Sequence, residues 1–278
     1  MPRSILIGLD GSDFSTAAVD LCIGWAKRFD CLLVGMGIVD TPSIDTPSAV
    51  PVGGTAFKEQ SVDAQLGDAR RQVEQFLERF TLKCTKAQVS HKLLENSGVP
   101  SDEIARQAQR YDMIVLGQET YFHFETQDQP GDTLEHVLRS APRPVVAVPS
   151  PLRPDSTSTL IAFDGSLPSA RALQMFQQSG LAEGSALHVL SAHSDQIEAA
   201  RLANTAIEFL QSHDLKAEPH AETLRGAAST MITDKARELD AALIVMGAYG
   251  QNTIKEFLLG STTRSIISDA TTPLFLYH

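Results

Sequence analysis

The chain contains the same sequence pattern twice, once in each half. The first copy begins with an apolar run that ends in Asp-Gly-Ser at 10–12, and the second begins with a run that ends in Asp-Gly-Ser at 164–166. Each copy later has an apolar run ending in glycine, at Gly117 and at Gly247, and closes on a proline-led strand. Repetition at this long period indicates a duplicated domain, because solenoid repeats are far shorter.

The two copies differ in length. Asp10 and Asp164 are 154 residues apart, whereas Gly117 and Gly247 are only 130 apart, so the first copy carries about 24 additional residues. Prolines and two adjacent glycines interrupt any helical or strand period over 41–57. We therefore predict an inserted loop at 41–57.

The length of 278 residues suits two domains, each large enough to bury a core. Prolines and serines near residue 150 are typical of a short linker. We predict one domain over 1–149, a linker over 150–158 and a second domain over 159–278.

Strands and helices alternate in both copies. The strands at 159–163 and 242–246 are continuous apolar runs, as expected when helices cover both faces of a parallel sheet. This pattern predicts a doubly wound α/β fold for each domain, with ligands at the carboxyl ends of the strands. In the second copy, the other strands are predicted at 186–191, 216–222 and 272–277, and the helices at 168–180, 196–213, 227–239 and 261–269.

Composition argues against several classes of partner and against membrane insertion. The net charge is −11 and neither copy has a basic run, which argues against duplex nucleic acid and anionic membranes as partners. No apolar stretch is long enough to span a membrane, and the first residues lack the pattern of a signal peptide, so we predict a cytoplasmic protein without membrane insertion. The three cysteines are odd in number and lack metal-site spacing, so we expect reduced, buried thiols.

A glycine motif follows the fourth strand of the second copy. Gly247 and Gly250 are followed, after nine residues, by Gly260 and then by Ser261-Thr262 at a helix start. Glycines allow close approach of the backbone to a ligand, and hydroxyls beside the free amides of a helix N-terminus suit phosphate oxygens. Each glycine taken alone is equally explained as a turn residue, and Ser-Thr as a helix cap. Their combination with Asp164-Gly165 favours a nucleotide site.

Asp164-Gly165-Ser166 and the motif from Gly247 to Ser261 resemble the universal stress protein family, here as a tandem of two domains. The resemblance implies a five-stranded parallel sheet of strand order 3-2-1-4-5 in each domain. It also implies ATP binding where the motif is kept, and pairing of domains through the last strand. The two halves would then form an intrachain pseudo-dimer, and association of two chains into a homodimer stays open.

The same resemblance assigns site residues in the second copy. Gly247 and Gly250 would line the ribose and the α-phosphate, and Asp164, beside Gly165, would lie near the nucleotide or a Mg²⁺ ion, because a carboxylate near polyphosphate needs a cation between them. The distal phosphates would lie against Gly260, Ser261 and Thr262. The adenine would contact Ser191 or Ala192.

The first copy departs from this motif. Thr120 stands where the second glycine belongs, and Asp132 replaces the serine or threonine at the helix start. A carboxylate there repels phosphate, and it also makes a good helix cap. Nearby acidic residues add to the repulsion, namely Glu119, Glu125 and Asp128. We predict that the first copy does not bind ATP.

Several enzyme classes lack their motifs in this chain. We find no G-x-S-x-G, no Walker A lysine and no G-x-G-x-x-G after either first strand. The histidines have no H-x-x-x-H spacing, and His188 and His193 have no evident carboxylate partner, so we predict no metal centre apart from Mg²⁺ with the nucleotide.

Three functional hypotheses follow. The first is an ATP-binding regulatory protein of the stress response that signals to an unidentified protein partner. The second is a slow ATPase that uses Arg264 or Lys255, although both are equally explained as solvated surface cations. The third is a scaffold that binds a protein or an apolar ligand, without nucleotide, through the first copy and its 41–57 loop.

Overall fold

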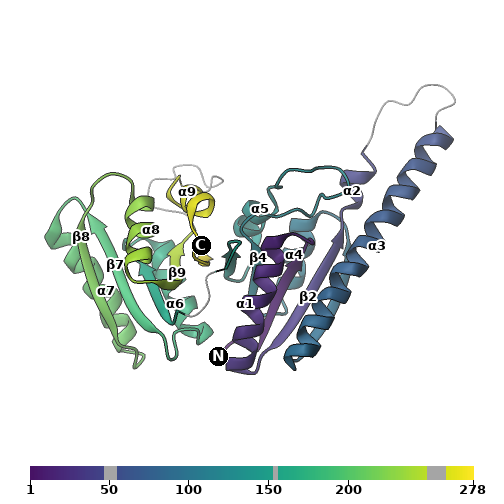
Figure 1. Cartoon of the computed structure of the whole chain (residues 1–278). Helices are drawn as coiled ribbons and strands as arrows, with labels where there is room; N and C mark the ends of the chain where they lie inside the picture. The colour runs from purple at the N-terminus through teal and green to yellow at the C-terminus, as the bar shows by residue number, and fades with distance from the viewer. Residues whose placement is uncertain (47–54, 153–155, 249–260) are drawn as a thin grey trace. The chain divides into compact units, whose positions relative to one another are not determined.

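The computed structural model describes residues 1–46, 55–152, 156–248 and 261–278 (Figure 1). The chain divides into two compact units. Residues Arg3–Pro142 form what we call the N-terminal unit, and Arg143–His278 together with Met1–Pro2 form the C-terminal unit.

The C-terminal unit has the predicted strand order. Its parallel strands run β8-β7-β6-β9-β10, which is the order 3-2-1-4-5 of the second copy. Every strand and helix predicted for this copy is present, and the bounds differ by a few residues at most. The elements are β6 (Ser158–Ala162), α6 (Leu167–Ser179), β7 (Ala186–His193), α7 (Gln196–Gln211), β8 (Ala217–Thr223), α8 (Ala228–Glu238), β9 (Ala241–Gly247), α9 (Ser261–Asp269) and β10 (Leu274–Tyr277).

One more strand extends this sheet. Strand β5 (Val145–Val148) is the last strand of the first copy, and it pairs antiparallel with β10, the last strand of the second copy. Phe275 of β10 lies opposite Val146, and both side chains are buried. The last strands of the two copies are therefore hydrogen-bonded to each other.

The N-terminal unit repeats the first four strands of this plan. Its parallel strands run β3-β2-β1-β4. Ile5, Leu6 and Ile7 of β1 are fully buried, as expected for a central strand covered by helices on both faces. The elements are β1 (Ser4–Leu9), α1 (Asp13–Phe29), β2 (Leu32–Val39), α2 (Thr41–Ile44), α3 (Thr55–Ala87), β3 (His91–Ser97), α4 (Pro100–Ala108), β4 (Met113–Gly117) and α5 (Thr133–Ser140).

Helices form two layers in each unit. In the N-terminal unit α1 contacts α3, and α4 contacts α5; in the C-terminal unit α6 contacts α7, and α8 contacts α9. Right-handed crossovers place the first pair of each unit on one face of the sheet and the second pair on the other. The doubly wound fold is thus confirmed.

The predicted inserted loop is partly helical. Residues Thr41–Ile44 form α2, with Pro42 in its first turn, where the missing amide of proline costs no hydrogen bond. Helix α3 begins at Thr55 and has 33 residues, against 16 in its counterpart α7. Much of the additional length of the first copy is therefore helix (Figure 1), and the loop prediction is wrong at both ends of 41–57. Residues 47–54 lie outside the described residues.

Two further expectations concern cysteines and membranes. All three cysteines are free and buried. Burial raises the pKa of the Cys31 and Cys84 thiols to about 11, so both are protonated near neutral pH. Among the described helices, none combines the length and the apolar character that crossing a membrane requires.

Candidate functional site

The winding direction of the C-terminal sheet reverses between β6 and β9. These strands are parallel neighbours, with Ile161 opposite Val245. The chain leaves β6 into α6 and approaches β9 from α8, on the other face of the sheet. Ligands of doubly wound folds bind at the carboxyl ends of such strands. This edge brings the first turn of α6, which follows the turn at 164–166, against Gly247.

The Asp-Gly-Ser turn starts helix α6. Gly165 has a φ of +75°, and an added Cβ would meet Leu202 Cδ2 at 2.5 Å, so glycine is required there. The Asp164 carboxylate accepts a hydrogen bond from the Ser166 amide at 3.0 Å, and the Ser166 hydroxyl caps α6 by accepting one from the Ser169 amide at 3.3 Å. Asp164 is exposed at the strand end.

Gly247 has a packing role. A Cβ at this position would lie 2.7 Å from the Ser169 nitrogen and 2.8 Å from the Pro168 carbonyl carbon, because the end of β9 packs against the first turn of α6. Gly117 of the N-terminal unit is equally crowded, with its added Cβ 2.6 Å from Phe14 Cβ of α1. The last glycine of each fourth strand is thus required by the fold, independently of any ligand.

Helix α9 begins beside the end of β9. The buried Thr263 hydroxyl donates to the Ala248 carbonyl at 2.8 Å, and the Ala248 amide donates to the Tyr277 carbonyl at 2.8 Å. The free amides of this helix N-terminus, with the half-buried Thr262 in its first turn, favour an anion. Gly250 and Gly260 lie outside the described residues, as does Lys255, and Ser261 is the first residue of α9.

The two residues predicted at the adenine differ in exposure. Ser191 is only 1% exposed, and its hydroxyl donates to the Phe163 carbonyl at 2.7 Å, which ties β7 to the end of β6. Ala192 follows it and is half-buried near the carboxyl end of β7. Of the two, Ala192 is therefore the more accessible to a ligand.

The corresponding aspartate of the N-terminal unit is buried. Asp10 is 4% exposed. One carboxylate oxygen accepts from the Ser12 amide at 3.0 Å and from its hydroxyl at 2.6 Å, and the other accepts from the Tyr121 amide at 2.7 Å. The segment that follows β4 thus supplies a hydrogen-bond donor to the Asp10 side chain, the counterpart of Asp164.

Aromatic side chains fill the space above this strand end. Phe122 is 2% exposed and approaches β1, where an added Cβ on Gly8 would meet its ring at 2.8 Å. An added Cβ on Gly11 would likewise meet the ring of Phe76, a residue of α3, at 2.4 Å. The Phe76 ring packs edge-on against the Phe124 ring, with the ring centroids 5.5 Å apart. The 120–131 segment is closed by a 2.7 Å hydrogen bond from the Gly131 amide to the Thr120 carbonyl.

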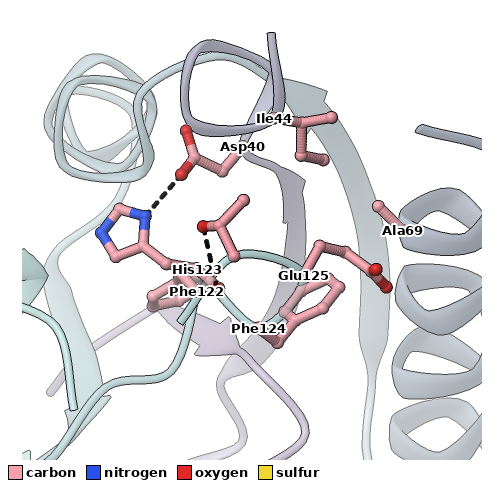
Figure 2. Close-up of a pocket in the computed structure, with 8 residues that line it drawn as sticks. Asp40, Ile44, Ala69, Phe122, His123, Phe124 and Glu125 are labelled. Carbon is pink, nitrogen blue, oxygen red and sulfur yellow. Dashed lines mark hydrogen bonds and ion pairs between the residues drawn. The ribbon is translucent and has the colours of Figure 1, made fainter. Parts of the chain in front are cut away.

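A small recess remains between these residues. Figure 2 shows the His123 ring hydrogen-bonded through Nδ1 to Asp40, with Phe122, Phe124 and Glu125 around it. The space between its lining atoms is about 160 Å³, part of it open solvent, and even this upper bound is below the roughly 300–1,000 Å³ of small-molecule pockets. It is too small for a nucleotide.

Asp132 does not cap helix α5 as predicted. It occupies the N-cap position, but its backbone φ of −93° and ψ of 11° are not those of a side-chain cap, and its carboxylate makes no capping hydrogen bond. Instead it lies 3.3 Å from His136 Nε2, one turn along the helix. The carboxylate is exposed, so a negative charge still stands at this helix N-terminus.

The model of the universal stress protein family matches residues 1–149 and 157–278. The chain belongs to this family. A universal stress protein of Synechocystis is 23% identical over 300 residues, covering 99% of this chain and 100% of the relative. One of Methanocaldococcus jannaschii is 28% identical over 152 residues, covering 54% of this chain and 83% of the relative.

Solved structures of universal stress proteins share the fold. One from Archaeoglobus fulgidus has a TM-score of 0.72 at 20% identity, with 99% of this chain and 96% of that chain covered. A putative universal stress protein from Pseudomonas aeruginosa has a TM-score of 0.63 at 18% identity, with 99% and 93% covered. The comparison supports two tandem universal stress protein domains in one chain.

Beyond the motif of this family, the structure brings together residues that the sequence analysis left apart. His188 was predicted to have no carboxylate partner, but its Nδ1 lies 3.5 Å from a carboxylate oxygen of Glu218 and 3.1 Å from Nε2 of His220. The prediction was wrong because the partners lie on a neighbouring strand. Local spacing does not reveal contacts set by strand register.

Proposed function

We propose that this universal stress protein binds ATP with Mg²⁺ in its C-terminal unit, that its N-terminal unit binds none, and that it acts by binding rather than by catalysis. The observation that carries the proposal is the contrast between two equivalent aspartates. Asp164 is exposed at the strand end, whereas Asp10 is buried and hydrogen-bonded to Tyr121 of its own unit.

The residues of the second copy suit a nucleoside polyphosphate. The amides at the start of α9, with the hydroxyls of Ser261 and Thr262, would hold the distal phosphates. Asp164 would hold Mg²⁺, an ion that prefers carboxylate and phosphate oxygens. Gly250 and Gly260 complete the motif on which the family resemblance rests.

The hydrogen bonds of the site suggest how occupancy would be transmitted. Thr263 anchors α9 to Ala248, and Ala248 is bonded to Tyr277 of β10, the strand that pairs with β5. ATP that orders the start of α9 would stabilise this chain of contacts. A ligand shifts a protein toward the state that it binds best, and a partner protein that prefers the same state would then be recruited. The intrachain pseudo-dimer is part of this proposal.

A reciprocal pair of variants tests the proposal. Calorimetric titration of ATP with Mg²⁺ into the full chain should give one site per chain. Ser261→Asp gives α9 the acidic start of α5 and should abolish this site, while Asp132→Ser should leave the count at one because aromatic side chains still fill the N-terminal edge. Thermal melts without ATP check that both variants fold.

Three results would contradict the proposal. Two equivalent sites in the unmodified chain would show that the N-terminal unit binds as well. Unchanged binding in Ser261→Asp would place the nucleotide elsewhere. Turnover of ATP at ordinary enzyme rates, lost on Ser261→Ala, would replace the regulatory function by an enzymatic one.

A further inference from the structure

Three metal-ligating side chains meet on one face of the C-terminal sheet. His188 lies on β7, and Glu218 and His220 lie on the adjacent strand β8. His188 is opposite Glu218 in the parallel register, and His220 is two residues further along β8, so all three project from the same face. Their ligand atoms all lie within 4.8 Å of one another.

The separations within the cluster match those around a tetrahedral ion. Zinc binds imidazole nitrogen at about 2.0–2.1 Å and carboxylate oxygen at about 2.0–2.2 Å. Two such ligands at a tetrahedral angle are roughly 3.3–3.5 Å apart. The His188 Nδ1 to His220 Nε2 distance is 3.1 Å, and the His188 Nδ1 to Glu218 Oε2 distance is 3.5 Å. Small adjustments would therefore place all three atoms around one ion.

The charges near the cluster are compatible with a bound cation. Burial lowers the pKa of the His220 imidazole, with smaller contributions from Lys235 and His188. The Lys235 ammonium itself is paired with Glu222 and Glu238, each at 2.8 Å. Glu218 is exposed and supplies the negative charge, so an ion can enter from solvent.

We propose that His188, Glu218 and His220 bind a divalent transition-metal ion, with Zn²⁺ as the reference ion and water as the fourth ligand. Three protein ligands of this type with an open position are typical of zinc sites that exchange a ligand. The cluster lies on β7 and β8, apart from the strand ends of β6 and β9, so this site does not depend on nucleotide binding.

The duplicated fold provides an internal comparison. By strand register, the positions of His188, Glu218 and His220 correspond in the N-terminal unit to Val34, Lys92 and Leu94. None of these three is a metal ligand. The site is therefore specific to the C-terminal unit, and the common fold does not require it.

Zinc titration tests the proposal. The full chain is stripped with EDTA, dialysed, and titrated with ZnCl₂ in a calorimeter without nucleotide. We expect one saturable site, weakened at least tenfold in His188→Gln, in His220→Gln and in Glu218→Gln. The matched control is His213→Gln, which removes an exposed histidine of the same unit and should leave the affinity unchanged. Co²⁺ should give the visible absorption of a four-coordinate ion, lost in the same variants.

The Glu218→Gln variant keeps the test decisive. The Glu218 side chain is exposed, so removing its negative charge should not disturb folding. Circular dichroism of each metal-free variant confirms this. Equal zinc affinity in the three cluster variants and the unmodified chain would overturn the proposal, as would the absence of any saturable site. Either result would leave the two histidines as a hydrogen-bonded pair only.

Discussion

The two units share a scaffold and differ in the exposure of the aspartate that follows their first strand, because Asp10 is buried and Asp164 is exposed. In both, an Asp-Gly-Ser turn follows the first strand, and the aspartate accepts a hydrogen bond of 3.0 Å from the serine amide. In the N-terminal unit the same aspartate also binds the Tyr121 amide, and Phe122 and Phe76 fill the adjacent space. An Asp-Gly-Ser turn therefore serves the fold first, because it persists in the unit where aromatic side chains fill the space beside it.

The largest expected effect comes from removing the aromatic filling. Phe122→Ala should destabilise the N-terminal unit by about 3–5 kcal/mol, because the side chain is 2% exposed and its loss leaves a cavity. Urea unfolding followed by fluorescence of the single tryptophan, Trp25 of α1, reports on this unit. Leu82→Ala in α3 is the control, since Leu82 is 69% exposed and should change stability by less than about 0.5 kcal/mol. Equal effects would show that Phe122 does not fill a core.

The shared scaffold predicts equal penalties at the two strand-end glycines. Gly117→Ala and Gly247→Ala should each cost about 1–3 kcal/mol in their own unit, because the new Cβ would overlap the first turn of α1 or of α6, respectively. Scanning calorimetry measures both. Gly24→Ala in α1 is a control with the opposite expected sign. Its new Cβ would enter open space, and alanine favours the helix over glycine, so this variant should stabilise the N-terminal unit by about 1 kcal/mol. A neutral Gly247→Ala would show that the packing role of this glycine is absent.

The two aspartates should respond in different measurements. Asp10→Ala should lower the stability of the N-terminal unit by about 1–3 kcal/mol, because it leaves the Tyr121 amide without its carboxylate acceptor, and should not change ATP affinity. Asp164→Ala should weaken ATP binding in the presence of Mg²⁺ about tenfold, a loss of roughly 1.4 kcal/mol. Unfolding curves and calorimetric titration of both variants give the four values. The contrast between the units fails if Asp10→Ala also weakens ATP binding.

A final expected effect, small just above pH 9, is a pH dependence caused by the buried thiols of the N-terminal unit, which contains all three cysteines. Burial raises the pKa of Cys31 and Cys84 from 9.0 to about 11, so between these values the folded unit retains protons that the unfolded chain releases. Stability should therefore fall as the pH rises from 9 to 11. Trp25 unfolding curves should show a shallower fall in a Cys31→Ala, Cys84→Ala double variant, and an identical fall would exclude the thiols as its cause.

The fold of the second copy was predictable from local sequence. Its strands β6 and β9 are uninterrupted apolar runs, and Ser166 and Gly180 mark the start and the end of α6 as cap residues do. The turn at 164–166 and the start of α9 were also placed correctly at the carboxyl edge. Periodicity and capping act over a few residues, and such signals are visible in a single sequence.

One missed feature is local, and two depend on distant residues. The 41–57 prediction treated proline as a breaker throughout, although Pro42 is compatible with the first turn of α2. Nothing in the local sequence shows that the Tyr121 amide bonds to Asp10, 111 residues away. The His188 cluster requires the register of β7 against β8. Tertiary pairing decides each of these contacts.

We have proposed that ATP binds at the strand edge of the C-terminal unit and not at that of the N-terminal unit. Hydrogen–deuterium exchange of the full chain, with and without ATP and Mg²⁺, locates binding directly. We expect slower exchange at 164–169 and at the start of α9, with no change at 10–15 or 118–133. Protection at 10–15 and 118–133 on addition of ATP would contradict the proposal.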